Sequence, residues 1–226
     1  MNLLEVCCGG LDSVRAAVEG GAVRIELCSR LEADGLTPAW EDLQAARRLY
    51  PELRIHVLVR PREGDFVYSP QELLEIMAQM DRARELGADA LVIGCLTPEG
   101  DVDTDALARL MPHAGGLPVT FHRAFDRCRN PFQALEDIIA AGCRRILTSG
   151  QAPTALEGAD LIRALQERAG GRIILLPGGG VTPENAALVL RRTGCTEIHA
   201  SASGQGLYGG RVTSAQKVAA ILKAIT

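Results

Sequence analysis

The regular alternation of apolar, strand-like runs with helical patterns constrains the fold of this chain more than any other feature. Strands are expected at Leu3–Cys7, Val23–Cys28, Arg54–Arg60, Ala90–Cys95, Pro118–His122, Arg145–Ser149, Arg172–Leu176 and Glu197–Ala200. Helices are expected at residues 11–19, 39–49, 70–86, 103–112, 131–140, 155–168, 183–192 and 213–224. Eight such strand–helix units without a linker-like break predict a single α/β domain, residues 1–226, folded as a (β/α)8 TIM barrel.

Turn-forming residues mark the same boundaries. Glycine or proline stands between a helix and the next strand at Pro51, Gly87, Gly142 and Gly194, where helices tend to stop. A similar glycine-containing triplet precedes strands 2, 4, 6 and 8, which gives a faint repeat of two-unit blocks. No G-x-G-x-x-G motif opens the first helix, so an open nucleotide-binding sheet is the less favoured architecture.

Composition narrows the classes of function. The chain has 226 residues, 47% of them hydrophobic, and a formal charge of -4. It contains no apolar run near the roughly 20 residues of a membrane span, no signal-peptide pattern at its start and no basic run of the kind that binds nucleic acid. Its seven cysteines include no C-x-x-C pair, which predicts reduced thiols. We therefore expect a cytoplasmic protein that binds neither nucleic acid nor membrane.

The polar residues of the strands point to a site inside the barrel. Leu4 and Val6 are apolar and are assigned to the helix-facing side, so Glu5 and Cys7 point inward. The same alternation turns further residues inward: Arg24, Glu26, Cys28, His56, Arg60, Thr120, His122, Glu197 and His199. Charged groups are costly to bury unless they are paired.

These inward residues fall into two sets by depth. Those deep in the strands are expected to form a buried ion network, namely Arg24, His56 and Glu197. Those near the strand ends are expected to converge in one pocket at the C-terminal face, where TIM barrels carry their chemistry, namely Glu5, Glu26, Arg60, His122 and His199. Arg123 and Asp126 follow His122 in the next turn. They are either further catalytic candidates or part of a polar cluster that braces the loop.

An anion site is expected beside that pocket. Gly178, Gly179 and Gly180 place bare backbone N–H groups before an expected helix with Pro183 at its first position, and helix N-termini bind anions. Loops after strands 7 and 8 often bind phosphate in these barrels. Hydroxyl and guanidinium groups expected to contribute are Ser149, Ser201, Ser203, Arg60 and Arg62.

Two thiols suggest a different chemistry. Cys7 and Cys28 are expected at equivalent positions on neighbouring strands, about 5 Å apart. Two inward thiols at that spacing are suited to a soft ion such as Cu(I). They could equally be small residues that fill the barrel.

Long motifs of the chain resemble one protein family. They include Glu5-Val6-Cys7-Cys8, Arg24-Ile25-Glu26-Leu27-Cys28, Gly35-Leu36-Thr37-Pro38, Arg60-Pro61-Arg62, Gly64-Asp65-Phe66, Phe121-His122-Arg123-Ala124-Phe125-Asp126, Leu147-Thr148-Ser149-Gly150 and His199-Ala200-Ser201. From Leu3 to Ser203 the chain resembles the CutC family, usually called copper homeostasis proteins. The resemblance implies a cytoplasmic TIM barrel that forms a homo-oligomer and is linked to copper.

The resemblance also implies roles for individual residues. The family's metal candidates correspond to Cys7 and Cys28, and its recurrent polar residues correspond to Glu5, Glu26, Arg60, His122, Arg123 and His199. The sequence departs from the family pattern at Glu63, at Asp34-Gly35 and in the short segment 204–210.

Two hypotheses of function remain. In the first, the protein binds Cu(I) through Cys7 and Cys28, with His122 or Cys8 nearby. In the second, the barrel is an enzyme for a small anionic or phosphorylated substrate. Glu5 or Glu26 would then be the base, His122 the acid or electrophile, and the anion clamp would be Arg60, Gly179, Gly180 and Ser203.

The lysines restrict the second hypothesis. Both of them, Lys217 and Lys223, fall in the last expected helix. No strand therefore offers a Schiff-base lysine, and the sequence argues against that aldolase route.

Overall fold

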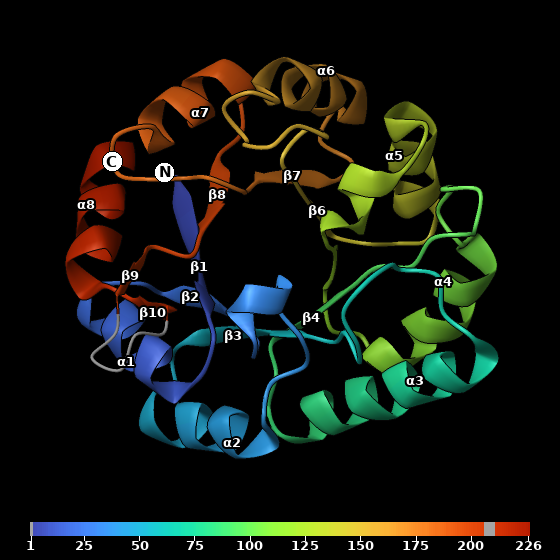
Figure 1. Cartoon of the computed structure of the whole chain (residues 1–226), viewed down its shortest axis with the longest axis horizontal. Helices are drawn as coiled ribbons and strands as arrows, with labels where there is room; N and C mark the ends of the chain where they lie inside the picture. The colour runs from blue at the N-terminus through green and yellow to red at the C-terminus, as the bar shows by residue number, and fades with distance from the viewer. Residues whose placement is uncertain (1, 206–210) are drawn as a thin grey trace.

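The structure, a computed structural model, describes residues 2–205 and 211–226. Eight parallel strands form one sheet in the order β7-β6-β5-β4-β3-β2-β1-β8. Their bounds are β1 Leu3–Cys8, β2 Arg24–Leu27, β3 Arg54–Leu58, β4 Ala90–Ile93, β5 Val119–Phe121, β6 Arg145–Thr148, β7 Ile174–Pro177 and β8 Glu197–Ala200. The strands form a ring in Figure 1, which confirms the predicted (β/α)8 barrel.

The two ends of the sheet meet at Gly178. This residue forms a parallel bridge with His199, just beyond the end of β7. A Cβ at position 178 would lie 2.6 Å from Cδ1 of Leu147 and 3.1 Å from Cβ of His199. Only glycine leaves room for β7 and β8 to approach here, so Gly178 closes the barrel.

In the described part of the chain, eight α-helices surround the ring (Figure 1). They are α1 Leu11–Glu19, α2 Trp40–Leu49, α3 Pro70–Glu85, α4 Thr104–Leu110, α5 Pro131–Ala140, α6 Ala159–Ala169, α7 Ala186–Thr193 and α8 Ala215–Ile225. Three short 3-10 helices lie between them, η1 Leu31–Ala33, η2 Met111–Ala114 and η3 Arg123–Arg127. Within the described residues, no helix is both long and apolar enough to cross a membrane.

The helix starts differ from prediction after β6 and β7. Helix α6 begins at Ala159 instead of residue 155, because Gly150 and Gly158 pack backbone against backbone in the preceding loop. Helix α7 begins at Ala186 instead of residue 183. Asn185 holds the turn before it by accepting the N–H of Thr182 and donating to the carbonyl of Gly180. The prediction that Pro183 opens this helix was therefore wrong.

A short hairpin follows β8 and was not predicted. Strands β9, Ser203–Gln205, and β10, Arg211–Thr213, pair antiparallel before α8 begins. Most of the short segment 204–210 lies outside the described residues.

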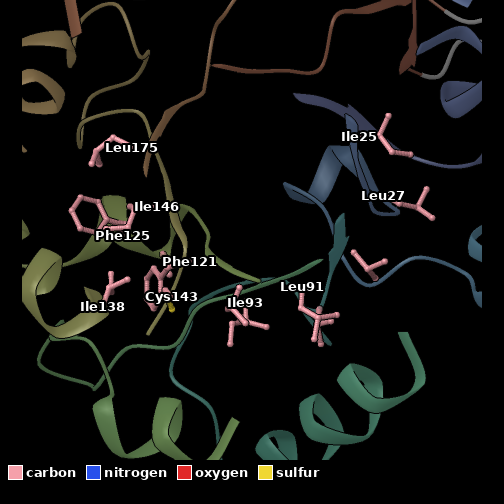
Figure 2. Packing of buried hydrophobic residues seen from close by; sticks show 14 of the residues in the cluster. Ile25, Leu27, Leu91, Ile93, Phe121, Phe125, Ile138, Cys143, Ile146 and Leu175 are labelled. Carbon is pink, nitrogen blue, oxygen red and sulfur yellow. The ribbon is translucent and has the colours of Figure 1, made fainter. Parts of the chain in front are cut away.

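The outer core packs between the strands and the helices. Figure 2 shows Ile25 and Leu27 of β2, and Leu91 and Ile93 of β4, directed into this layer. All four are at most 1% exposed. Cys8 belongs to the same core, while its neighbour Cys7 packs with the interior cluster of Cys28, Leu58 and Val92. The alternation read from the sequence therefore divides the strand residues between barrel interior and helix layer as predicted.

Candidate functional site

The deep interior of the barrel holds the ion network expected from the sequence. Arg24 Nε lies 2.9 Å from Oε2 of Glu5, and its Nη2 lies 2.5 Å from Oε2 of Glu197. Glu197 also pairs with Arg145 of β6 at 2.8 Å. Nδ1 of His56 lies 2.7 Å from Oε2 of Glu5. This network supports the site from below.

Above the network, a cavity of about 660 Å³ opens at the C-terminal ends of the strands. Four of the five residues expected to converge there line it: Glu26, Arg60, His122 and His199. Glu5 is the exception, because it lies fully buried beneath His199. The pocket was thus correctly located, but Glu5 supports it instead of facing it.

The floor of the cavity combines a thiol, a carboxyl and an imidazole. Sγ of Cys7 donates to Oε2 of Glu26 at 3.3 Å. Nε2 of His199 lies 3.8 Å from the same oxygen, and Nδ1 of His199 lies 3.0 Å from Oε1 of Glu5. Ligand atoms of Cys7, Glu26 and His199 all lie within 4.8 Å of one another. The three side chains form a group that could hold a metal ion.

Burial and neighbouring charges set the protonation of this floor. Burial opposes ionisation of Glu5, but His56, His199 and Arg24 hold its pKa well below the usual value. Burial also opposes charge on His199, yet Glu26, Cys7 and Glu5 raise its pKa well above the usual value. Burial raises the pKa of Glu26, and Glu5 adds to the rise while His199 opposes it. An imidazolium therefore lies beside a carboxyl group that retains its proton more readily than usual.

The two thiols are close, but not for the predicted reason. Cys7 is paired in register with Glu26, and not with Cys28. The equivalent positions expected on β1 and β2 were therefore wrong, because the stagger between the strands moves Cys28 further toward the mouth. The sulfurs nevertheless lie 3.6 Å apart on the diagonal. The contact with Cys28, together with burial, raises the pKa of Cys7 well above its usual value.

One wall of the cavity carries His122 and Arg60. Nδ1 of His122 accepts the N–H of Ala124 at 3.1 Å. Burial, reinforced by the charge of Arg60, lowers the pKa of His122 to about 3. The imidazole is therefore neutral at pH 7. Phe66 lies against this wall, with its ring centroid 5.0 Å from that of His122 and 5.0 Å from Cζ of Arg60.

Arg123 and Asp126 also line the cavity, and Asp126 is engaged by the neighbouring loop. Its oxygens accept from the hydroxyl of Thr148 at 2.5 Å and from the N–H of Ser149 at 3.1 Å. Nε of Arg123 donates to Asp126 at 2.8 Å, and its Nη2 donates to Oγ of Ser149 at 3.0 Å. Asp126 thus positions Arg123, which matches the loop-bracing interpretation of this cluster.

Two anion-binding predictions fail at the glycine run and the serine next to it. The N–H of Gly178 donates to the carbonyl of Thr148 at 2.9 Å, so it is not free for an anion. Ser149 is fully buried, and its hydroxyl donates to the carbonyl of Ala152 at 2.6 Å. Gly179 and Gly180 do line the cavity, together with Ser201 and Ser203.

Arg62 is likewise committed elsewhere. Its guanidinium pairs with Glu72 and Asp65 and packs over the ring of Tyr68. This arrangement ties the loop after β3 to the start of α3. The prediction that Arg62 clamps an anion was wrong, because its side chain faces that loop and not the cavity.

Other cavity residues were missed in the sequence. Lys217 of α8 reaches the rim, where its Nζ donates to the carbonyl of Ser203 at 2.7 Å. The sequence did not indicate that Lys217 lies at the cavity, because its position depends on the unpredicted hairpin before α8. Lys217 reaches the cavity from a helix and not from a strand, so the prediction that no strand offers a lysine stands. Phe66 belongs to the motif Gly64-Asp65-Phe66, but the sequence does not show that the loop folds this ring against the cavity.

Gly94, just after β4, was also missed. A Cβ there would lie 2.5 Å from Nδ1 of His122. The position of the imidazole therefore depends on a glycine in the neighbouring strand end.

Known proteins of one family are similar to this chain over most of its length. A sequence model of the CutC family matches residues 2–204. A family protein CutC from Bacteroides thetaiotaomicron is 50% identical over 198 residues, which cover 88% of this chain and 80% of the relative. One from Chromobacterium violaceum is 50% identical over 205 residues, which cover 90% of this chain and 82% of the relative.

A solved structure agrees as well. A protein named for copper homeostasis, CutC from Streptococcus agalactiae, superposes with a TM-score of 0.85 at 35% identity. The match covers 89% of this chain and 99% of that one. On these grounds the chain belongs to the CutC family.

Proposed function

We propose that this protein takes part in copper homeostasis by binding Cu(I) at the floor of its cavity, through Cys7 and Cys28. The observation that carries the proposal is the 3.6 Å separation of the two sulfurs. Metal–thiolate bonds of about 2.3 Å place two sulfurs on one ion roughly 3.7–4.6 Å apart, from tetrahedral to linear geometry. Only a small movement of Cys7 toward the cavity is needed to reach that range.

The donor set also suits a soft ion. Thiolates and imidazole favour Cu(I) over Mg²⁺ or Ca²⁺. The group of Cys7, Glu26 and His199 suggests His199 as a further ligand, in place of the His122 or Cys8 considered from the sequence. The imidazolium of His199 would release a proton as the ion binds. His122 belongs to the opposite wall beside Phe66, and Cys8 packs in the outer core.

Titration of the reduced protein with Cu(I), against a competing chelator, tests this function. We expect tight binding of one ion, and a loss of at least tenfold in affinity for Cys7→Ser or Cys28→Ser. Cys143→Ser is the matched control, because Cys143 is buried in the outer core away from the cavity. Equal affinity in all four proteins would show that the thiol pair is only packing.

A second candidate is a barrel enzyme acting on a small phosphorylated substrate. The observation that favours it is backbone geometry: within the described part of the chain, the N–H groups of Gly179 and Gly180 have no protein acceptor. A Cβ on Gly179 would lie 3.6 Å from Cζ of Arg123, so a guanidinium adjoins this backbone. In this candidate Glu26 would act as base and His199 as acid.

A crystal grown with sulfate tests the anion end of the second candidate. We expect the ion on the N–H groups of Gly179 and Gly180, beside Ser203. Sulfate found only elsewhere on the protein, with this part of the cavity empty, would contradict the prediction.

We also propose a cytoplasmic location, with assembly of identical chains. All seven cysteines are free thiols in the structure, as a reducing compartment would keep them. Sedimentation analysis of the purified protein tests the assembly, and a monomer at micromolar concentration would contradict it.

A further inference from the structure

Two buried polar groups on one wall of the cavity have no hydrogen-bond partner among the residues that the structure describes. They are Nε2 of His122 and Nε of Arg60. Each side chain belongs to a residue only 5% exposed, and both residues line the cavity. Buried polar atoms in native proteins are nearly always hydrogen-bonded. Two exceptions on side chains that both lie against Phe66 therefore call for a partner that the described residues do not provide.

The hydrogen-bonding role of His122 is fixed. Its Nδ1 is occupied as an acceptor by the N–H of Ala124. In the neutral ring the proton therefore resides on Nε2, which makes this atom a donor. Gly94 behind the ring and Phe66 beside it restrict its position. His122 thus presents one N–H from a rigid ring.

Arg60 brings a charge that is not balanced locally. Its Nη1 donates to the carbonyls of Ala33 and Gly35, at 2.9 and 3.0 Å, and its Nη2 donates to that of Gly64 at 3.1 Å. These bonds explain its orientation. Among the described residues, no carboxylate lies within ion-pair distance of it. A buried guanidinium held only by neutral carbonyls keeps a net positive charge, which is costly without an anion nearby.

We propose that this wall, made of Arg60, His122 and Phe66, is a binding subsite for the carboxylate group of a small organic ligand. Two N–H donors, one charged and one neutral, match the two oxygens of a carboxylate. The face of Phe66 suits a short apolar stem attached to that group. Phosphate is better matched to the glycine backbone across the cavity, where the N–H groups of Gly179 and Gly180 adjoin Arg123.

The inference extends beyond copper binding. It adds a carboxylate subsite to the same cavity in which the second candidate would bind its substrate. The test measures binding and not turnover. It is made on metal-free reduced protein, so its failure and the failure of either proposed function can be told apart.

Imidazole ¹H–¹⁵N NMR during titration with acetate is the direct measurement. The chain has four histidines, so the His122 signal can be assigned by its loss in His122→Asn. We expect the Nε2 resonance of His122 to shift with acetate in a saturable manner. Asparagine can still accept the N–H of Ala124 through a short side-chain turn, which helps this variant to fold.

Calorimetry on the variants completes the test. We expect His122→Asn to bind acetate about tenfold more weakly or worse, since it loses a hydrogen bond to a charged group. Arg129→Gln should bind as the native protein does, because Arg129 is exposed and pairs with Asp101 outside the cavity. An unmoved His122 resonance, or equal acetate affinity in His122→Asn and native protein, would overturn the proposal and leave water as the partner of this wall.

Discussion

At the residue scale, Glu5 fixes the floor of the site from beneath. It is 0% exposed, and its two oxygens contact His56, His199 and Arg24. The sequence showed that Glu5 points inward, but depth in the barrel decides whether a residue supports a site or faces it. Because its oxygens are occupied, Glu5 acts through His199 and is a positioning residue.

We predict that Glu5→Gln lowers the free energy of unfolding by about 3–5 kcal/mol, because it leaves Arg24 as a buried charge with one partner fewer. Urea denaturation measures the change. Glu99→Gln removes an exposed carboxylate and should leave stability within about 0.5 kcal/mol of the native protein. A Glu5→Gln protein as stable as the Glu99→Gln control would show that the network does not depend on this charge.

At the element scale, helix α3 and the loop before it form a brace beside the cavity. Ser69 caps α3 by accepting the N–H of Glu72 at 3.3 Å, and the carboxylate of Glu72 accepts the N–H of Ser69 at 2.7 Å. Arg62 pairs with Glu72 and lowers its pKa to about 2, with the Ser69 hydrogen bonds adding to the effect. The same loop carries Phe66 and Gly64 into the cavity wall.

We predict that Ser69→Ala destabilises the protein by about 1 kcal/mol, the usual cost of losing such a cap. Thermal unfolding at pH 7 provides the measurement. The neighbouring Gln71→Ala, in the exposed first turn of the same helix, serves as control and should be nearly neutral. If the two variants melt at the same temperature, the capping box contributes nothing here.

At the scale of the whole molecule, contacts that depend on closure of the barrel could not be predicted from the sequence. Alternation along each strand identified the inward residues, because that pattern is local. Relations between strands were less accessible: the diagonal approach of Cys7 and Cys28 follows from the stagger of a closed sheet. Lys217 reaches the mouth only because a hairpin precedes α8. Gly178 resembled an anion-binding glycine, although its lack of a side chain serves closure.

The pH dependence of the free energy of unfolding should also depend on the protonation of the buried His122. The pKa of His122 is about 3 in the folded protein, whereas an exposed histidine titrates near 6.5. Between these values the unfolded chain binds a proton that the folded chain does not. The contribution of His122 to stability is therefore complete above about pH 6.5, and it is lost progressively as the pH falls toward 3.

We predict that His122→Asn loses less unfolding free energy than the native protein between pH 7 and pH 4. Urea denaturation of both proteins at each pH gives the comparison. Other acid-sensitive groups, including Glu5, are common to both and cancel in the difference. Identical pH dependence in the two proteins would place the pKa of His122 close to its unfolded value.

The size of the cavity has a consequence for what must occupy it. A volume of about 660 Å³ equals the space of roughly twenty water molecules in the liquid, at about 30 Å³ each. One ion between two sulfurs would displace only a few of them. The remainder is the room that proteins give to organic molecules of modest size. A resident ion would therefore leave most of the cavity volume free for an organic molecule bound above it.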